Sequence, residues 1–194
     1  MRSDAPRSCP ALPGALVMLT LCIATSVMPA MGLDGTAIDG DAAELTEADA
    51  QLLASYRLIV PVAGVTKRNL VDNYNERRGS HLHEALDIPA PRGTQVVAAG
   101  DGRLVKLFRS VAGGLTVYQF DPSERFAYYY AHLDHYAQDL SEGMMLKRGD
   151  AIGAVGTTGD APADSPHLHF AVFRLGPEKQ WWKGSPINPF PLLD

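Results

Sequence analysis

Residues 94–132 carry the pattern that decides the fold class: TQVVAAGDGRLVKLFRSVAGGLTVYQFDPSERFAYYYAH. Runs rich in valine, leucine, tyrosine and phenylalanine alternate there with glycine, aspartate and proline, which is typical of short strands joined by turns. Similar runs follow at 151–155 and 167–174, and no long helical period appears between Pro61 and Leu175. We therefore expect a mainly β fold, a small antiparallel β-sandwich or barrel.

One helix is expected ahead of this β region. Thr46 and Asp49 have the spacing of a capping box, and the apolar residues around them lie near one helical face, so we place a helix at 46–57. Pro61 prevents its continuation. Because the preceding residues are small and acidic, the expected organisation is a linker and helix at 33–60, followed by a domain at 61–194.

Residues 1–32 have the composition of a secretory signal peptide. Arg2 and Arg7 form a basic start, residues 11–31 contain no charged side chain, and small residues surround a cleavage point after Gly32. An uncleaved N-terminal anchor is the alternative, because the apolar segment is near spanning length. Both interpretations predict an exported protein, with membrane contact only through residues 11–31 if they are uncleaved.

The composition excludes several classes of protein. The net charge of −5 argues against a broad basic surface, so we expect no nucleic-acid partner. The two cysteines, Cys9 and Cys22, both lie within the first 22 residues. The rest of the chain therefore has no disulfide scaffold, cysteine-ligated zinc or cysteine nucleophile.

Histidines are the candidates for chemistry in this thiol-free region. The motif His167-x-His169 lies in a run typical of a strand, where side chains alternate between the two faces. Leu168 and Phe170 would then point to the core, and both imidazoles would share the opposite face; two solvated histidines on an edge strand are the alternative. The six histidines fall into three clusters, which together predict a metal site: His81-x-His83, His132-x-x-His135 and His167-x-His169.

A second group of candidate ligands lies in SHLHEALDI at 80–88. His83, Asp87 and His169 would supply two imidazoles and a carboxylate, a set that suits catalytic Zn²⁺ with one open position. The spacing alone leaves Glu84 and His81 as rival ligands.

Three blocks of sequence resemble the motifs of the M23 (LytM/lysostaphin-type) zinc metallopeptidases. They are HEALDIPAPRGTQVVAAGDG at 83–102, YYYAHL at 128–133 and SPHLHF at 165–170, in the family's order, and the similarity extends from about residue 61 to residue 194. The resemblance implies that zinc is bound by His83, Asp87 and His169, and that His132 and His167 are catalytic.

The resemblance also implies the family's fold, a small antiparallel β domain built from a duplicated motif. A recurring glycine spacing agrees with such a duplication: Gly93-x-x-Val96-x-x-x-Gly100 and Gly149-x-x-Ile152-x-x-x-Gly156. Tyr130, two residues before His132, would share its strand face and either hydrogen-bond within the site or pack.

The function implied by the resemblance is zinc-dependent hydrolysis of peptide cross-links in bacterial peptidoglycan. The expected partners are the stem peptides of peptidoglycan, and the expected location is the periplasm or cell envelope. One alternative is a non-catalytic envelope protein that binds peptidoglycan and activates a cell-wall amidase. A second is a metal-binding or structural envelope protein without catalysis.

Overall fold

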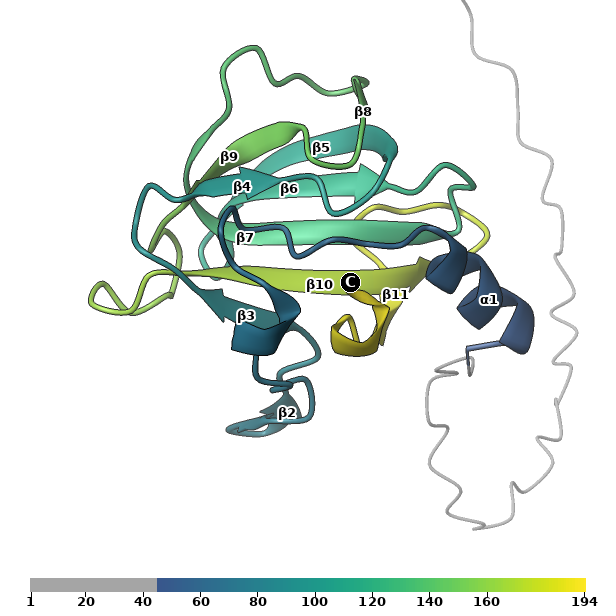
Figure 1. Ribbon diagram of the computed structural model, residues 1–194, viewed down its shortest axis with the longest axis horizontal. Helices are drawn as coiled ribbons and strands as arrows, with labels where there is room; N and C mark the ends of the chain where they lie inside the picture. Colours follow the sequence, from purple (N-terminus) through teal and green to yellow (C-terminus); the bar gives the residue numbers. More distant parts are fainter. Residues whose placement is uncertain (1–44) are drawn as a thin grey trace, which may run out of the picture. The chain divides into compact units, whose positions relative to one another are not determined.

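The structure, a computed structural model, describes residues 45–194 (Figure 1). The expected signal peptide or anchor at 1–32 and most of the expected linker lie outside the described residues. Within residues 45–194, no helix is long and apolar enough to cross a membrane.

The described chain is mainly β, as predicted. A nine-stranded antiparallel sheet has the main order β11-β10-β7-β6-β5-β8, with β3 paired to β10 and β9 paired to both β7 and β4. A separate two-stranded sheet pairs β1 with β2. The elements are α1 (Glu47–Ser55), β1 (Arg77–Arg78), β2 (His81–Leu82), β3 (Leu86–Pro89), β4 (Gln95–Val97), β5 (Gly102–Ser110), β6 (Gly114–Phe120), β7 (Phe126–Tyr136), β8 (Met145–Leu146), β9 (Ala151–Val155), β10 (His167–Leu175) and β11 (Gly184–Ile187), with short 3-10 helices at Lys67–Asn69 and Phe190–Leu192.

The core lies on one face of the curled sheet. It is built from alternate residues of the long strands, including the fully buried Phe126, Tyr128 and Tyr130 of β7 and Leu168 and Phe170 of β10. Because strand side chains alternate, the intervening residues of the same strands face the other side of the sheet.

The two segments with the same glycine spacing pair with each other. β4 and β9 are antiparallel, with Val96 opposite Gly153. The N–H of Gly93 donates to the carbonyl of Val155, and the N–H of Gly149 donates in the same way to Ala98, at 2.8 and 2.9 Å. The recurring spacing therefore reflects two similar segments that face each other in the sheet.

The helix forms where the capping residues predict it. The Thr46 hydroxyl accepts a hydrogen bond from the Asp49 N–H and donates one to the Asp49 carboxylate. The buried Asp49 carboxylate also pairs with Arg125, just before β7, and with Arg174, near the end of β10. The helix is thus held at the end of β10 that is opposite to His167 (Figure 1).

The C-terminal tail adds an edge strand to the sheet. Residues 176–194 include β11, which pairs with Val172–Leu175 of β10. Pro186 lies within this strand. A proline is tolerated there because β11 is an edge strand, where one side of the backbone needs no ladder hydrogen bonds.

Candidate metal centre

Strand β10 brings the predicted site residues together. His169 lies opposite Asp87 of β3 on one side and opposite Ala131 of β7 on the other. Leu168 and Phe170 are fully buried, so His167 and His169 share the face away from the core. The predicted alternation along this strand is confirmed.

Three polar atoms converge in this region. Nε2 of His83 lies 3.0 Å from Oδ1 of Asp87 and 3.2 Å from Nδ1 of His169. Nδ1 of His169 lies 3.1 Å from the same Oδ1. These three side chains form a group that could hold a metal ion.

The separations fit a tetrahedral ion. Zinc binds imidazole nitrogen and carboxylate oxygen at about 2.0–2.2 Å, which puts neighbouring ligand atoms roughly 3.3 Å apart. Nδ1 of His83 donates to the carbonyl of Asn73, so the neutral ring keeps the lone pair of Nε2 for a metal ion. Two imidazoles with one carboxylate are a donor set that suits zinc.

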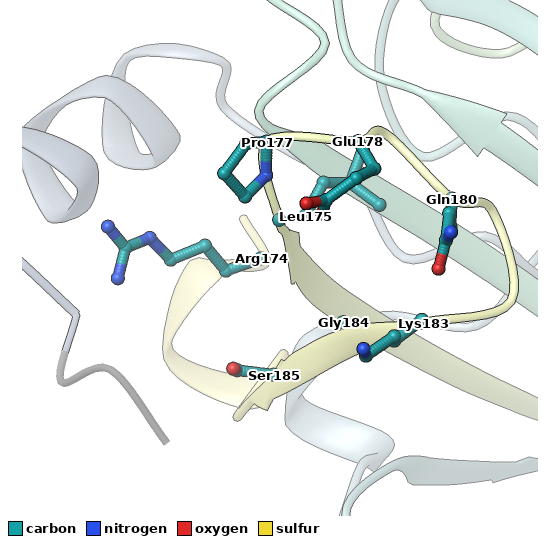
Figure 2. Close-up of a pocket in the computed structure, with 9 residues that line it drawn as sticks. Arg174, Leu175, Pro177, Glu178, Gln180, Lys183, Gly184 and Ser185 are labelled. Atoms are coloured by element: carbon teal, nitrogen blue, oxygen red, sulfur yellow. The ribbon is translucent and has the colours of Figure 1, made fainter. Parts of the chain in front are cut away.

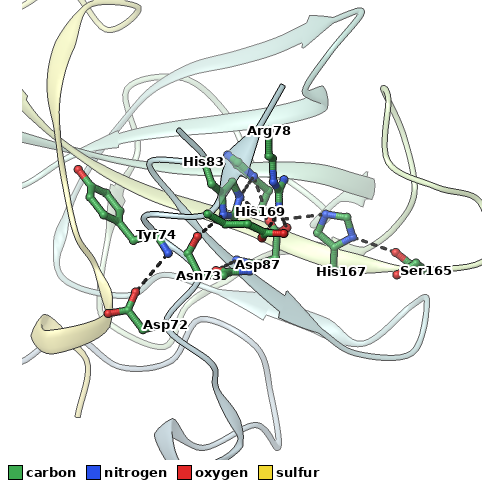
Figure 3. A network of polar contacts seen from close by, with 10 residues as sticks. Asp72, Asn73, Tyr74, Arg78, His83, Asp87, Ser165, His167 and His169 are labelled. Carbon is green, nitrogen blue, oxygen red and sulfur yellow. Dashed lines mark hydrogen bonds and ion pairs between the residues drawn. The ribbon is translucent and has the colours of Figure 1, made fainter. Parts of the chain in front are cut away.

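Residues outside the group orient it (Figure 3). Arg78 Nη2 lies 2.5 Å from Oδ2 of Asp87, the oxygen that the imidazoles do not share. The side-chain oxygen of Asn73 accepts from the backbone N–H of Asp87, while its carbonyl accepts from His83. Asn73 therefore positions two candidate ligands at once, the kind of outer contact that sets ligand orientation in metal sites.

His132 reaches the site through a break in β7. Ala131 pairs with β10, whereas Leu133 pairs with β9, so the strand changes partner at His132. His132 has a φ of 61°, a left-handed conformation that non-glycine residues adopt at a cost of about 1–3 kcal/mol. Its backbone N–H donates to the Gly113 carbonyl at 2.8 Å, which stabilises this conformation. The irregularity turns His132 toward His167 and His169, with ring centroids 5.0 and 5.6 Å away.

His132 and His167 share one arrangement of hydrogen bonds. Nδ1 of His132 donates to the Thr158 carbonyl at 2.8 Å, and Nδ1 of His167 donates to the Ser165 carbonyl at 2.9 Å. These bonds leave each Nε2 available to the site, and Nε2 of His167 is 3.7 Å from Oδ1 of Asp87. Two imidazoles with an open nitrogen therefore flank the candidate metal group.

The surroundings shift the acid–base behaviour of these groups. Burial lowers the pKa of His132 and that of His169 below the usual histidine value, despite opposing hydrogen bonds. For Asp87, burial alone would raise the pKa, but hydrogen bonds from His169, His83 and Arg78 outweigh it and hold the pKa far below its ordinary range. These shifts favour a neutral His169 and an ionised Asp87, which are the forms that bind a metal.

A hollow of about 210 Å³ opens onto the group and is lined by Tyr129, His132, Asp160, His169 and Arg78, among others. A larger hollow of about 380 Å³ lies at the other end of β10, between Arg174, Glu178 and Lys183 (Figure 2). No histidine lines the larger hollow, so the candidate site is the smaller one.

Some expectations about neighbouring residues change. Tyr130 does not share the face of His132, because the break in β7 turns His132 away from the core. Tyr130 stays in the core, where its hydroxyl donates to Gln119 and accepts from the Ala99 N–H. Packing, the second expectation for Tyr130, is therefore the correct one. Glu84 is exposed and lies outside the group, and His81 lines the hollow without joining the ligands.

The sequence patterns did not single out several residues that surround the site. Arg78, Asn73 and Asp160 lie outside the quoted motifs, whereas Tyr129 lies within YYYAHL without a role assigned to it there. His135, by contrast, points away and pairs with Asp134 on the surface.

Residues 81–189 match the family model of peptidase family M23. This chain belongs to peptidase family M23. The M23 chain is 28% identical over 120 residues to the L-Ala--D-Glu endopeptidase of Bacillus subtilis, which covers 59% of this chain and 35% of the relative. It is 26% identical over 128 residues to the murein hydrolase activator NlpD of Salmonella typhimurium, which covers 66% of this chain and 30% of the relative.

The fold of the M23 chain is similar to that of lysostaphin, an antimicrobial peptidase from Staphylococcus simulans. The TM-score is 0.56 at 24% identity, and the match covers 71% of this chain and 53% of the lysostaphin chain. The M23 chain spans about a third of the length of the two curated relatives.

Proposed function

We propose that this chain is a zinc-dependent endopeptidase that hydrolyses peptide cross-links of bacterial peptidoglycan. The observation that carries the proposal is the convergence of His83 Nε2, Asp87 Oδ1 and His169 Nδ1, 3.0–3.2 Å apart. Two further imidazoles, His132 and His167, stand beside this group. A binding role alone would not require both.

In this proposal His83, Asp87 and His169 hold the zinc ion. When bound, zinc would supply a water of lowered pKa and polarise the carbonyl of the scissile bond. The chain's own part is to present two neutral imidazoles and one carboxylate oxygen in a fixed arrangement. Arg78 holds the second carboxylate oxygen, so that one oxygen of Asp87 faces the imidazoles.

His132 and His167 then handle protons. Peptide hydrolysis needs a group that accepts a proton from the attacking water and a donor that stabilises the developing oxyanion. Each imidazole has Nδ1 tied to a carbonyl and Nε2 open to the site, so each can perform either task. The lowered pKa of His132 favours the neutral form, which is the form that accepts a proton.

Stem peptides of peptidoglycan are the proposed substrate. The similarity to a bacterial L-Ala--D-Glu endopeptidase and to a murein hydrolase activator supports a cell-wall polymer as the target. We further propose that residues 1–32 export the protein to the periplasm or cell envelope, with 33–60 as linker and helix and 61–194 as the peptidase domain.

Activation of an amidase is the second candidate function, and the similarity to NlpD favours it. The two functions are separated by incubating zinc-loaded protein with purified peptidoglycan and identifying the released fragments by mass spectrometry. Peptide-bond cleavage that is lost in His132→Ala supports the endopeptidase. The amidase-activator function is supported instead if the wild-type protein cleaves nothing but stimulates an added amidase, and if His132→Ala stimulates that amidase equally well.

A further inference from the structure

A continuous series of aromatic rings leads away from the candidate metal centre. We call Tyr129, Tyr118, Phe108, Trp181 and Trp182 the aromatic strip. Ring centroids are 4.6 Å apart between Tyr129 and Tyr118, and 4.8 Å apart between Tyr118 and Trp181. Phe108 and Trp182 each lie against Trp181, at 5.3 and 5.2 Å.

The strip is continuous with the site. Tyr129 lines the 210 Å³ hollow, and its ring lies 6.0 Å from that of His169 in an edge-to-face arrangement. It also contacts Phe173, which shares the strand face of His169 because it is four residues along β10. The candidate metal centre and the strip therefore occupy one face of the sheet, with Tyr129 belonging to both.

Packing explains only part of the strip. Trp181 and Phe173 cover a small buried cluster of Phe120, Ala127 and Leu175 on this face. Trp182, however, is 61% exposed and Phe108 is 40% exposed. Exposed aromatic side chains gathered in one place, next to a candidate active site, are typical of a binding surface.

The chemistry of the strip suits flat ligands that carry hydroxyl groups. The hydroxyls of Tyr118 and Tyr129 can each donate and accept hydrogen bonds. In peptidoglycan the stem peptides are made of small and charged amino acids, whereas the pyranose rings of the glycan have broad C–H faces with hydroxyls at the edges. Such faces match aromatic rings whose margins carry hydroxyl and indole N–H groups.

We propose that the aromatic strip binds sugar rings of the glycan to which the scissile peptide is attached. This inference rests on the proposed function for its choice of polymer. Because Tyr129 adjoins the candidate metal centre, a glycan on the strip would hold its attached stem peptide beside the hollow. The chain would therefore cleave stems that are still attached to sugar better than free peptides.

Tryptophan fluorescence tests the sugar site without requiring catalysis. Trp181 and Trp182 are the only tryptophans in the chain, so the signal comes from the strip. Full-length protein treated with a chelator is titrated with peptide-free oligosaccharides of N-acetylglucosamine and N-acetylmuramic acid. We expect a saturable change, and about tenfold weaker binding for Trp182→Ala, with most of the affinity retained in Trp182→Phe.

Met145→Ala is the matched control. It also removes a large exposed apolar side chain, from β8, and should leave sugar binding unchanged. A flat titration with the wild-type protein overturns the proposal. So does binding that is equal in Trp182→Ala and wild type, or a saturable change caused by free stem peptide and not by sugar.

Hydrolysis is measured separately, with one stem peptide offered either attached to a disaccharide or free. We expect kcat/KM to favour the sugar-linked form at least tenfold in the wild type, and Trp182→Ala to reduce this ratio toward one. Equal rates on both forms contradict the sugar site. If neither form is cleaved but the oligosaccharide still binds, the endopeptidase proposal fails and the sugar site stands.

Discussion

Oδ2 of Asp87 lies 2.5 Å from Nη2 of Arg78, while Oδ1 of the same carboxylate lies 3.0 Å from Nε2 of His83. The two oxygens therefore have different partners, a cation on one side and candidate metal-ligating imidazoles on the other. This division predicts that Asp87 binds zinc through Oδ1 alone, with Arg78 holding the carboxylate in place.

Replacing Arg78 should therefore weaken zinc binding. Arg78→Ala leaves Asp87 free to rotate, and outer-contact losses of this kind reduce metal affinity by about 10–100-fold. Competition with a chromophoric chelator measures the affinity. Arg77→Ala, at the exposed neighbouring position in β1, should bind zinc as the wild type does. Unchanged affinity in Arg78→Ala would show that Asp87 needs no such support.

Removal of a ligand should remove the metal. His169→Ala and Asp87→Ala each leave two ligands, so neither variant should keep stoichiometric zinc after dialysis. Metal analysis of purified protein measures this content. Full zinc occupancy in His169→Ala would contradict the ligand assignment.

Removal of a flanking imidazole should separate metal binding from hydrolysis. His132 lies beside the candidate ligands and outside their group, so His132→Ala should keep zinc near the wild-type level. Hydrolysis of peptidoglycan should fall by about 10²-fold or more, the range for a lost general acid or base. Loss of zinc from His132→Ala would place His132 among the ligands.

Acid should abolish zinc binding and activity together. Protons compete with zinc for imidazole nitrogen, and burial lowers the pKa of His169 and of His132. Because the lowered pKa makes protonation harder, half-loss should occur below pH 6.5, the usual histidine value. Measurements of zinc affinity from pH 4 to 8 test whether half of the binding is lost below pH 6.5. Loss of half of the zinc binding above pH 6.5, or a zinc affinity that does not change down to pH 4, would argue against this site.

Asp49 should contribute stability that depends on pH. Burial by itself would raise its pKa, but the Thr46 hydrogen bond and the charges of Arg125 and Arg174 lower it below the unfolded value of about 3.9. The contribution is therefore complete at neutral pH and is lost as the pH falls below about 3.9. At pH 7, Asp49→Asn should lower the free energy of unfolding by about 1–3 kcal/mol.

Urea unfolding at several pH values measures this effect. The difference in the free energy of unfolding between wild type and Asp49→Asn should become smaller in acid. Glu47→Gln changes an exposed carboxylate of the same helix and should have little effect. A difference that stays constant from pH 7 to pH 3 would contradict the role of the Asp49 charge.

Local patterns in the sequence were sufficient for much of the fold. The helix and the long strands were predictable because capping residues, turns and alternation depend on near neighbours along the chain. The shared face of His167 and His169 follows from the same alternation. Strand β11 was not predictable in this way, because a short edge strand with a proline forms only when β10 offers a partner.

The candidate site depends on both the local sequence and the tertiary structure. The sequence determined which histidines and which carboxylate are candidates, through residue type and resemblance. Only the tertiary structure decided that His132 leaves the core side of Tyr130 and turns to the site, because β7 changes partner at His132 and interrupts the alternation. Arg78 likewise has no local signature, and the aromatic strip combines rings from separate segments of the chain. Their positions arise from pairing between residues far apart in the chain, which spacing along the sequence does not encode.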